Sequence, residues 1–146
     1  MGQTTSRPLS PHLSIYKRGV HMMASIMHRA TGFVLATAGM LTLLWWLAAI
    51  GGGEESYAQF LSYIVDAGDE ATSFQSACNW FFRLLALAVT FSFFQHLFSG
   101  IRHLMMDMGA GFELNSNRMS AWAVFIAAFT ATGIVALYAI SKFVGV

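Results

Sequence analysis

Four polar or small residues recur at helical spacing in the otherwise apolar stretch 91–107, namely His96, Gly100, His103 and Asp107. A helix turns by about 100° per residue, so these side chains point within about 40° of one direction. An ionisable group near the centre of a bilayer costs about 2.5 kcal/mol or more, so the stripe must face protein, a cofactor or water. The neutral imidazole of His96 suits haem iron as a ligand. The alternative is a histidine that only packs or forms hydrogen bonds.

A second polar face is predicted earlier in the chain, where the residues recur at offsets of 0, 3, 4 and 7: Ser25, His28, Arg29 and Gly32. Such residues share one side of a helix. Arg29 alone would be explained as an anchor that reaches to the membrane surface, and Ser25 as a helix cap. Hydroxyl, imidazole and guanidinium groups on one face also fit a polar ligand site. Both interpretations stay open at this point.

A haem between two imidazoles needs a second donor at the depth of His96. The other histidines do not provide it, because they lie nearer the membrane surface or before the first predicted span: His12, His21, His28 and His103. The missing ligand is therefore expected from a helix of a partner.

Four neighbours of His96 have simpler explanations. For Arg102, His103 and Asp107, pairing or reaching to the membrane surface is a sufficient explanation, and for His103 it is the favoured one. Gly100 lies one turn from His96, where it either lets another helix approach or leaves space for a macrocycle beside the ligand.

The composition is that of an integral membrane protein. Of 146 residues, 56% are hydrophobic and 10% are charged, against about a quarter charged in soluble domains, and the mean hydropathy is +0.58. The net charge of +1, from scattered Lys and Arg, argues against nucleic acid as a partner. The single Cys78 excludes an internal disulfide framework and covalent c-type haem, so any haem would be bound non-covalently.

Charge-poor stretches predict three transmembrane helices, over about residues 26–50, 79–106 and 119–142. Residues 1–20 contain both prolines and predict an irregular basic arm, while 51–79 predicts an acidic loop with a short amphipathic helix. Lys and Arg occur in the arm and near the junction of spans two and three, but not in the acidic loop. This pattern predicts an amino terminus on the cytoplasmic or matrix side. We expect a single membrane-anchor domain over 1–146, without a cleavable signal peptide.

Three blocks of sequence stand out for their polar residues: RPLSPHLSIYK at 7–17, SIMHRATG at 25–32 and HLFSGIRHLMMD at 96–107. They resemble the signature blocks of the cytochrome b subunit of succinate dehydrogenase, the larger membrane anchor of respiratory complex II. The blocks occur in order and at matching positions relative to the three spans. The resemblance therefore covers almost the whole chain.

The resemblance implies a role for four residues. His96 would be one axial ligand of haem b, with the other ligand supplied by the second, smaller anchor subunit. His28 and Arg29 would approach the haem propionates, and Ser25 and Arg29 would line a ubiquinone site shared with the iron–sulfur subunit. Hydroxyl and guanidinium donors suit that site because they stabilise the oxygen of a quinone that gains electrons.

The predicted protein is a membrane anchor subunit of a succinate:ubiquinone oxidoreductase. We expect an all-α bundle of three spans, completed by the second anchor subunit and surrounded by lipid in a bacterial cytoplasmic or mitochondrial inner membrane. Flavin and iron–sulfur chemistry would belong to the flavoprotein and iron–sulfur subunits, and this chain would hold no catalytic residue. The alternatives are the anchor of a quinol:fumarate reductase and a structural or stand-alone b-type cytochrome. The lack of a second in-membrane histidine pair counts against di-haem kinds.

Overall fold

The computed structural model describes residues 12, 15–65, 68 and 71–144, and every regular element in these ranges is a helix. Three of the helical segments are long and apolar enough to cross a membrane. This confirms the predicted all-α membrane fold. Most of the predicted arm, including the greater part of the block at 7–17, lies outside the described residues, as do Asp66, Asp69 and Glu70 of the predicted acidic loop.

The first long segment is one helical rod in three parts: α1 (Val20–Val34), the π-helix η1 (Leu35–Gly39) and α2 (Met40–Gly51). Its 32 residues exceed the roughly 20 that cross a hydrocarbon core, and it begins before the predicted span 26–50. Near η1, the hydroxyl of Thr37 donates to the Phe33 carbonyl at 2.8 Å. Such bonds compete with the main-chain ladder of a helix, and π-turns inside α-helices often mark functional sites.

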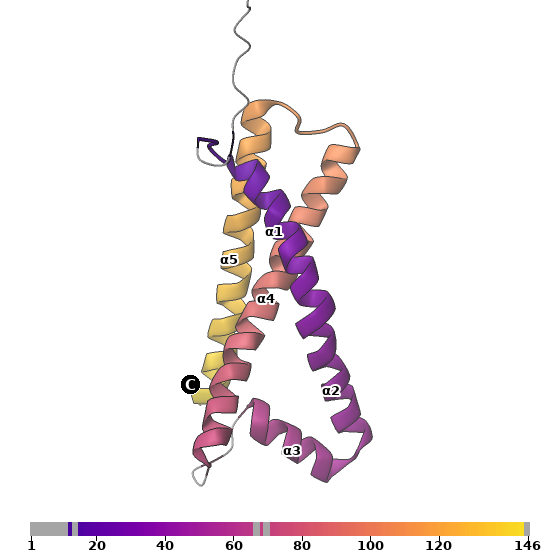
Figure 1. The fold of residues 1–146 in the computed structure, drawn as a ribbon, viewed down its shortest axis with the longest axis vertical. Helices are drawn as coiled ribbons and strands as arrows, with labels where there is room; N and C mark the ends of the chain where they lie inside the picture. The colour runs from indigo at the N-terminus through magenta and orange to yellow at the C-terminus, as the bar shows by residue number, and fades with distance from the viewer. Residues whose placement is uncertain (1–11, 13–14, 66–67, 69–70, 145–146) are drawn as a thin grey trace, which may run out of the picture.

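A short helix, α3 (Glu54–Ile64), connects the rod to the second long helix and is the amphipathic helix expected in the acidic loop. Its Glu54 and Glu55 are exposed, whereas Phe60 is buried against Trp45 with ring centroids 5.1 Å apart. The Asn79 side chain donates to the carbonyls of Ser62 and Tyr63, which joins the end of α3 to the next helix. Figure 1 shows α3 lying across the end of the molecule that is opposite the start of α1.

The second and third long helices are α4 (Ser73–Asp107) and α5 (Leu114–Val144). α4 begins with a capping box in which Thr72 and Gln75 satisfy each other's backbone N–H groups. After α4 the chain reverses through Gly109, whose φ of 86° favours glycine. Figure 1 shows α1 crossing α4 near the middle of the molecule, while α2 diverges from α4 towards α3. α5 packs against both α4 and α1.

Small side chains dominate the contacts between the three long segments. Ala24, Ala121 and Ala128 are at most 1% exposed, so the backbones of α1, α4 and α5 approach closely. Most large apolar side chains point outward instead, as in Phe33 and Leu137, which are 71% and 69% exposed. This inside-out distribution fits a protein whose outer surface contacts lipid or another membrane subunit.

Candidate functional site

The crossing of α1 and α4 brings three histidines together, although they are far apart in the sequence. The rings of His28 and His96 are stacked, with centroids 4.0 Å apart and planes 11° apart. His103 meets the edge of His28 with centroids 5.2 Å apart. All three side chains are partly buried. The two polar faces predicted from spacing therefore face each other, and we call this group the histidine cluster.

The backbone of His28 orients the side chain of His96. Nδ1 of His96 lies 3.0 Å from the carbonyl oxygen of His28. A carbonyl oxygen only accepts, so Nδ1 carries the proton and donates this bond. In a neutral imidazole the other nitrogen, Nε2, then has a free lone pair, which is the arrangement typical of a metal-binding histidine.

Ser99 orients the ring of His28, and sequence spacing alone missed this residue. Its hydroxyl lies 2.7 Å from Nδ1 of His28 and donates within α4 to the carbonyl of Gln95. Since the hydroxyl has one proton, the His28 Nδ1–H is the donor to Ser99. Ser99 is 1% exposed and stands three residues after His96, on a neighbouring face of α4. The position of Ser99 three residues after His96 is the sequence feature that could have indicated its contact with the histidines.

Two glycines face the histidine rings, but only one of them is required for a ring to fit between the helices. A Cβ built on Gly32 would stand 2.9 Å from Cε1 of His96, closer than real Cβ atoms approach. A Cβ on Gly100 would stand 3.6 Å from Cε1 of His28, an ordinary contact. Gly32, on the opposite helix, therefore provides the space beside the His96 ring, whereas Gly100 faces the ring of His28. Spacing within one helix could not reveal which glycine faces which ring.

Ser25 and Arg29 lie on α1, where Ser25 stands three residues before His28 and Arg29 directly follows it. Arg29 is exposed and Ser25 is partly buried, and neither side chain has a hydrogen bond or ion pair with any other described residue. Ser25 is not a helix cap, because α1 begins at Val20 after the N-cap Gly19. The capping alternative for Ser25 is thus wrong, and both polar groups are available to a ligand.

Comparison with known proteins identifies the family. Residues 3–135 match the family model described as succinate dehydrogenase/fumarate reductase transmembrane subunit. The chain belongs to this family. The chain is 33% identical over 126 residues to the succinate dehydrogenase cytochrome b556 subunit of Rickettsia felis, which covers 86% of this chain and 87% of the relative.

Two further proteins similar to this chain come from Paracoccus denitrificans and from the mitochondria of Bos taurus. The cytochrome b556 subunit of Paracoccus denitrificans is 30% identical over 119 residues, with 82% of this chain and 81% of the relative covered. The mitochondrial cytochrome b560 subunit of Bos taurus is 33% identical over 129 residues, with 84% and 66% covered. The predicted family is confirmed, and so is the assignment to a subunit of an enzyme complex.

This family member also has a buried polar face on α4 that the sequence reasoning did not single out: Ser92, Gln95, Ser99 and Arg102. These residues face the interior, whereas the predicted stripe from His96 to Asp107 runs from partly buried to exposed. Arg102 is buried and bonds to two neutral side chains of α5, so it does not reach to the membrane surface. The carboxamide of Gln95 is fully buried, and no described residue bonds to it.

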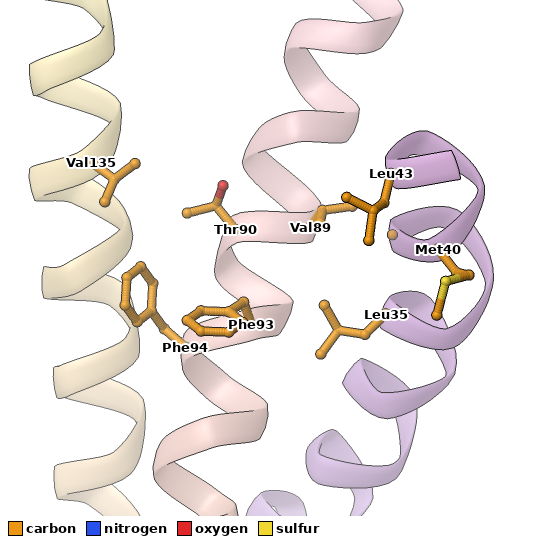
Figure 2. A pocket seen from close by; sticks show the side chains of 9 residues that line it. Leu35, Met40, Leu43, Val89, Thr90, Phe93, Phe94 and Val135 are labelled. Atoms are coloured by element: carbon orange, nitrogen blue, oxygen red, sulfur yellow. The ribbon is translucent and has the colours of Figure 1, made fainter. Parts of the chain in front are cut away.

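An apolar cavity of about 460 Å³ lies further along the same helices. Figure 2 shows it between the rod, α4 and α5, with Leu35 pointing from the rod towards α4, which carries Phe93 and Phe94, and with Val135 on the far helix. It begins at η1, about one turn past Gly32. Among the described residues, no three His, Cys, Asp or Glu side chains converge as ligands for a metal ion.

Proposed function

We propose that this chain is the cytochrome b anchor of a succinate dehydrogenase, where it binds haem b through His96 and helps to form a ubiquinone site. Family membership and the names of the relatives support the anchor role. The observation that carries the haem proposal is the bond from His96 Nδ1 to the His28 carbonyl, which leaves Nε2 available to iron. Electrons from succinate would reach quinone in the membrane through this subunit.

The residues around His96 fit a haem ligand for two reasons. The ring is held in one orientation by the His28 carbonyl and by stacking on the His28 ring. Gly32 leaves the ring the space that a Cβ would fill. A bound haem supplies a one-electron carrier. His28 and the adjacent Arg29 would hold its propionates, because imidazole and guanidinium groups donate hydrogen bonds to carboxylates.

The second axial ligand would come from the smaller anchor subunit. Two axial imidazoles must point their nitrogens at one iron from opposite sides. His28 is not placed to do so with His96, because the two rings are stacked face to face with their centroids 4.0 Å apart. His103 contacts His28 rather than lying opposite His96. A donor from a partner helix on the outward face of the cluster meets the requirement.

Ser25 and Arg29 would bind ubiquinone. A carbonyl oxygen of quinone gains negative charge as electrons arrive, and hydroxyl and guanidinium donors stabilise that charge. Both side chains are free of partners among the described residues and lie near the start of α1. This position would be shared with the iron–sulfur subunit, which delivers the electrons and is itself supplied by the flavoprotein subunit.

We infer that the amino terminus of the chain faces the cytoplasm or the mitochondrial matrix. Lys and Arg are absent from 51–79 and present in the arm and beside the junction of α4 and α5. Positive loops remain on the inner side of a membrane. Ser25 and Arg29 then lie near the inner surface, where soluble subunits would dock.

The rival function is the anchor of a quinol:fumarate reductase, since the family description includes both enzymes. The names of the relatives favour succinate dehydrogenase. His96 is the one residue of the spans that we propose as a haem ligand. A single proposed ligand fits one haem shared between two subunits better than two haems held by one chain.

Replacing His96 by alanine in the assembled complex tests the haem proposal. We expect the low-spin b-type absorption spectrum to disappear and the haem content to fall to background, because the axial nitrogen is lost. His103→Ala is the matched control, since it removes a neighbouring imidazole of the same cluster and should keep the spectrum. An unchanged spectrum in His96→Ala, or loss in His103→Ala alone, would refute the assignment. Subunit content checks assembly.

A further inference from the structure

Arg102 brings a positive charge into the protein without an acidic partner. Its side chain is only 7% exposed. Nε donates to the Ser120 hydroxyl at 3.1 Å, and Nη2 donates to the Asn117 carboxamide oxygen. Both partners are neutral, and no carboxylate of a described residue forms an ion pair with Arg102. Of the seven acidic residues in the sequence, five precede α4 and the other two are the exposed Asp107 and Glu113.

A buried cation of this kind needs an anion. Removing a charge from water is costly unless an opposite charge compensates it, and neutral hydrogen-bond acceptors compensate only in part. Arginine is always protonated, so it cannot avoid the cost by losing its proton. A planar guanidinium is also well matched to the oxygens of phosphate, which it can contact through two N–H groups.

A cavity of about 280 Å³ lies beside this guanidinium, between α4 and α5. Its polar lining comes from Arg102, Ser116 and Ser120. The remaining wall is mostly apolar and includes Phe98 and Met105. A polar end with a positive charge and hydroxyl groups thus continues into an apolar surface.

We propose that this cavity binds the phosphate group of a membrane phospholipid. Arg102 stands five residues before the end of α4, at the depth where headgroups meet acyl chains in a helix that crosses the membrane. Its charge and the hydroxyl of Ser116 would contact the phosphate, while the apolar wall would contact the first part of the acyl chains. A free inorganic anion would leave that wall without a partner. The site faces α5 and is separate from the histidine cluster, which faces α1.

Lipid analysis of the purified complex tests the proposal. Native mass spectrometry of the whole complex in mild detergent should detect a phospholipid that stays bound to the parental protein. In Arg102→Gln its occupancy should fall at least about tenfold, because the charge is lost. Arg118→Gln is the matched control. Arg118 is exposed and lies on α5 between Ser116 and Ser120 of the cavity wall, but it does not line the cavity, so its replacement should not change the occupancy.

A second variant separates lipid binding from folding. Ala127→Leu fills the cavity from the apolar wall without altering Arg102 or its bonds to α5. It should also release the lipid, whereas Ala139→Leu, which lies outside both cavities on the same helix, should not. If Arg102→Gln fails to assemble, the result for Ala127→Leu decides. Lipid retained by well-assembled Arg102→Gln or by Ala127→Leu overturns the proposal.

Adding ligands back distinguishes the source of the phosphate. Delipidated complex should regain thermal stability with phosphatidylglycerol, and not with inorganic phosphate at equal concentration, and Arg102→Gln should not respond. A response to inorganic phosphate alone would overturn the phospholipid assignment. Loss of a partner subunit from Arg102→Gln, with unchanged lipid content, would assign the charge to a carboxylate of that partner and would also overturn it.

Discussion

His28 contacts its neighbours through both its backbone and its side chain. Its carbonyl accepts the Nδ1–H of His96, and its ring stacks on the ring of His96. Ser99, in turn, binds Nδ1 of His28 and so sets the angle of that ring. A residue first selected for its possible contact with haem propionates therefore also determines the geometry of the proposed iron ligand.

At the residue scale, the first prediction concerns Ser25 and Arg29. Neither side chain bonds to another described residue, so replacing them should not weaken the helix contacts. In Ser25→Ala and Arg29→Leu, ubiquinone reduction by the assembled complex should fall by about tenfold, equivalent to about 1.4 kcal/mol for one charge-assisted contact. Electron transfer from succinate to an artificial acceptor that bypasses the quinone site should stay at the parental level.

The control for this prediction is Arg18→Leu, which removes another exposed arginine near the start of α1. Its ubiquinone reductase rate should be unchanged. Parental rates, Michaelis constants and inhibitor sensitivity in well-assembled Ser25→Ala and Arg29→Leu complexes would show that these residues do not bind quinone.

At the element scale, the crossing of α1 and α4 decides which polar groups meet. Small residues at the crossing bring the two backbones close, and there Gly32 has less space for a Cβ atom than Gly100. The hydrogen bond and the stacked ring hold His96 in place, so it cannot move away from an added methyl group without losing these contacts. The helix crossing and the ligand orientation thus depend on each other.

Gly32→Ala should therefore disturb both the crossing of α1 with α4 and the orientation of His96. We expect a loss of about 1–3 kcal/mol in stability, as is typical of overpacking, and a lower content of b-type haem in the complex. Gly133→Ala on α5 is the matched control, because a Cβ there meets no atom within 4 Å. Thermal unfolding and absorption spectra of both variants measure the difference. If Gly32→Ala matches Gly133→Ala in both measurements, the packing argument is wrong.

At the scale of the whole molecule, the two ends differ in charge. One end has α3 with exposed Glu54 and Glu55, and the other has the start of α1, the junction of α4 and α5, and Arg118. Outward-facing apolar side chains cover the length between them. This arrangement fits a membrane anchor with one surface for soluble subunits and one for the opposite aqueous side. The additional anchor subunit that would complete the bundle stays a prediction.

Cysteine labelling tests this orientation. The half-buried Cys78 is first replaced by serine, and a cysteine is placed at exposed Glu55 or exposed Glu113. Because positive charge marks the inner side, an impermeant maleimide added from the periplasmic or intermembrane side should label Glu55→Cys and not Glu113→Cys. Permeabilised membranes should allow labelling at both positions. The reverse pattern would invert the topology and move the proposed quinone site to the other surface.

The amino-acid sequence by itself determined the number and type of the elements and the family. Long charge-poor stretches have one solution in a bilayer, because a helix satisfies all its backbone groups internally. Helical spacing also placed His28 with Ser25, and His96 with His103, on common faces. The composition of the acidic loop also predicted the short helix α3.

Only the tertiary structure decided which of these faces meet. In a soluble helix the apolar side marks the interior, but in a membrane helix lipid and protein interior are equally apolar, so that signal is absent. On α4 the polar stripe that contains His96 and the polar stripe that contains Gln95 are offset by one residue, which turns them about 100° apart around the helix. Both stripes recur at helical spacing, so periodicity alone does not tell which one faces inward. The packing of α1 and α5 selected the inward stripe, set Gly32 rather than Gly100 against His96, and left Arg102 buried between α4 and α5.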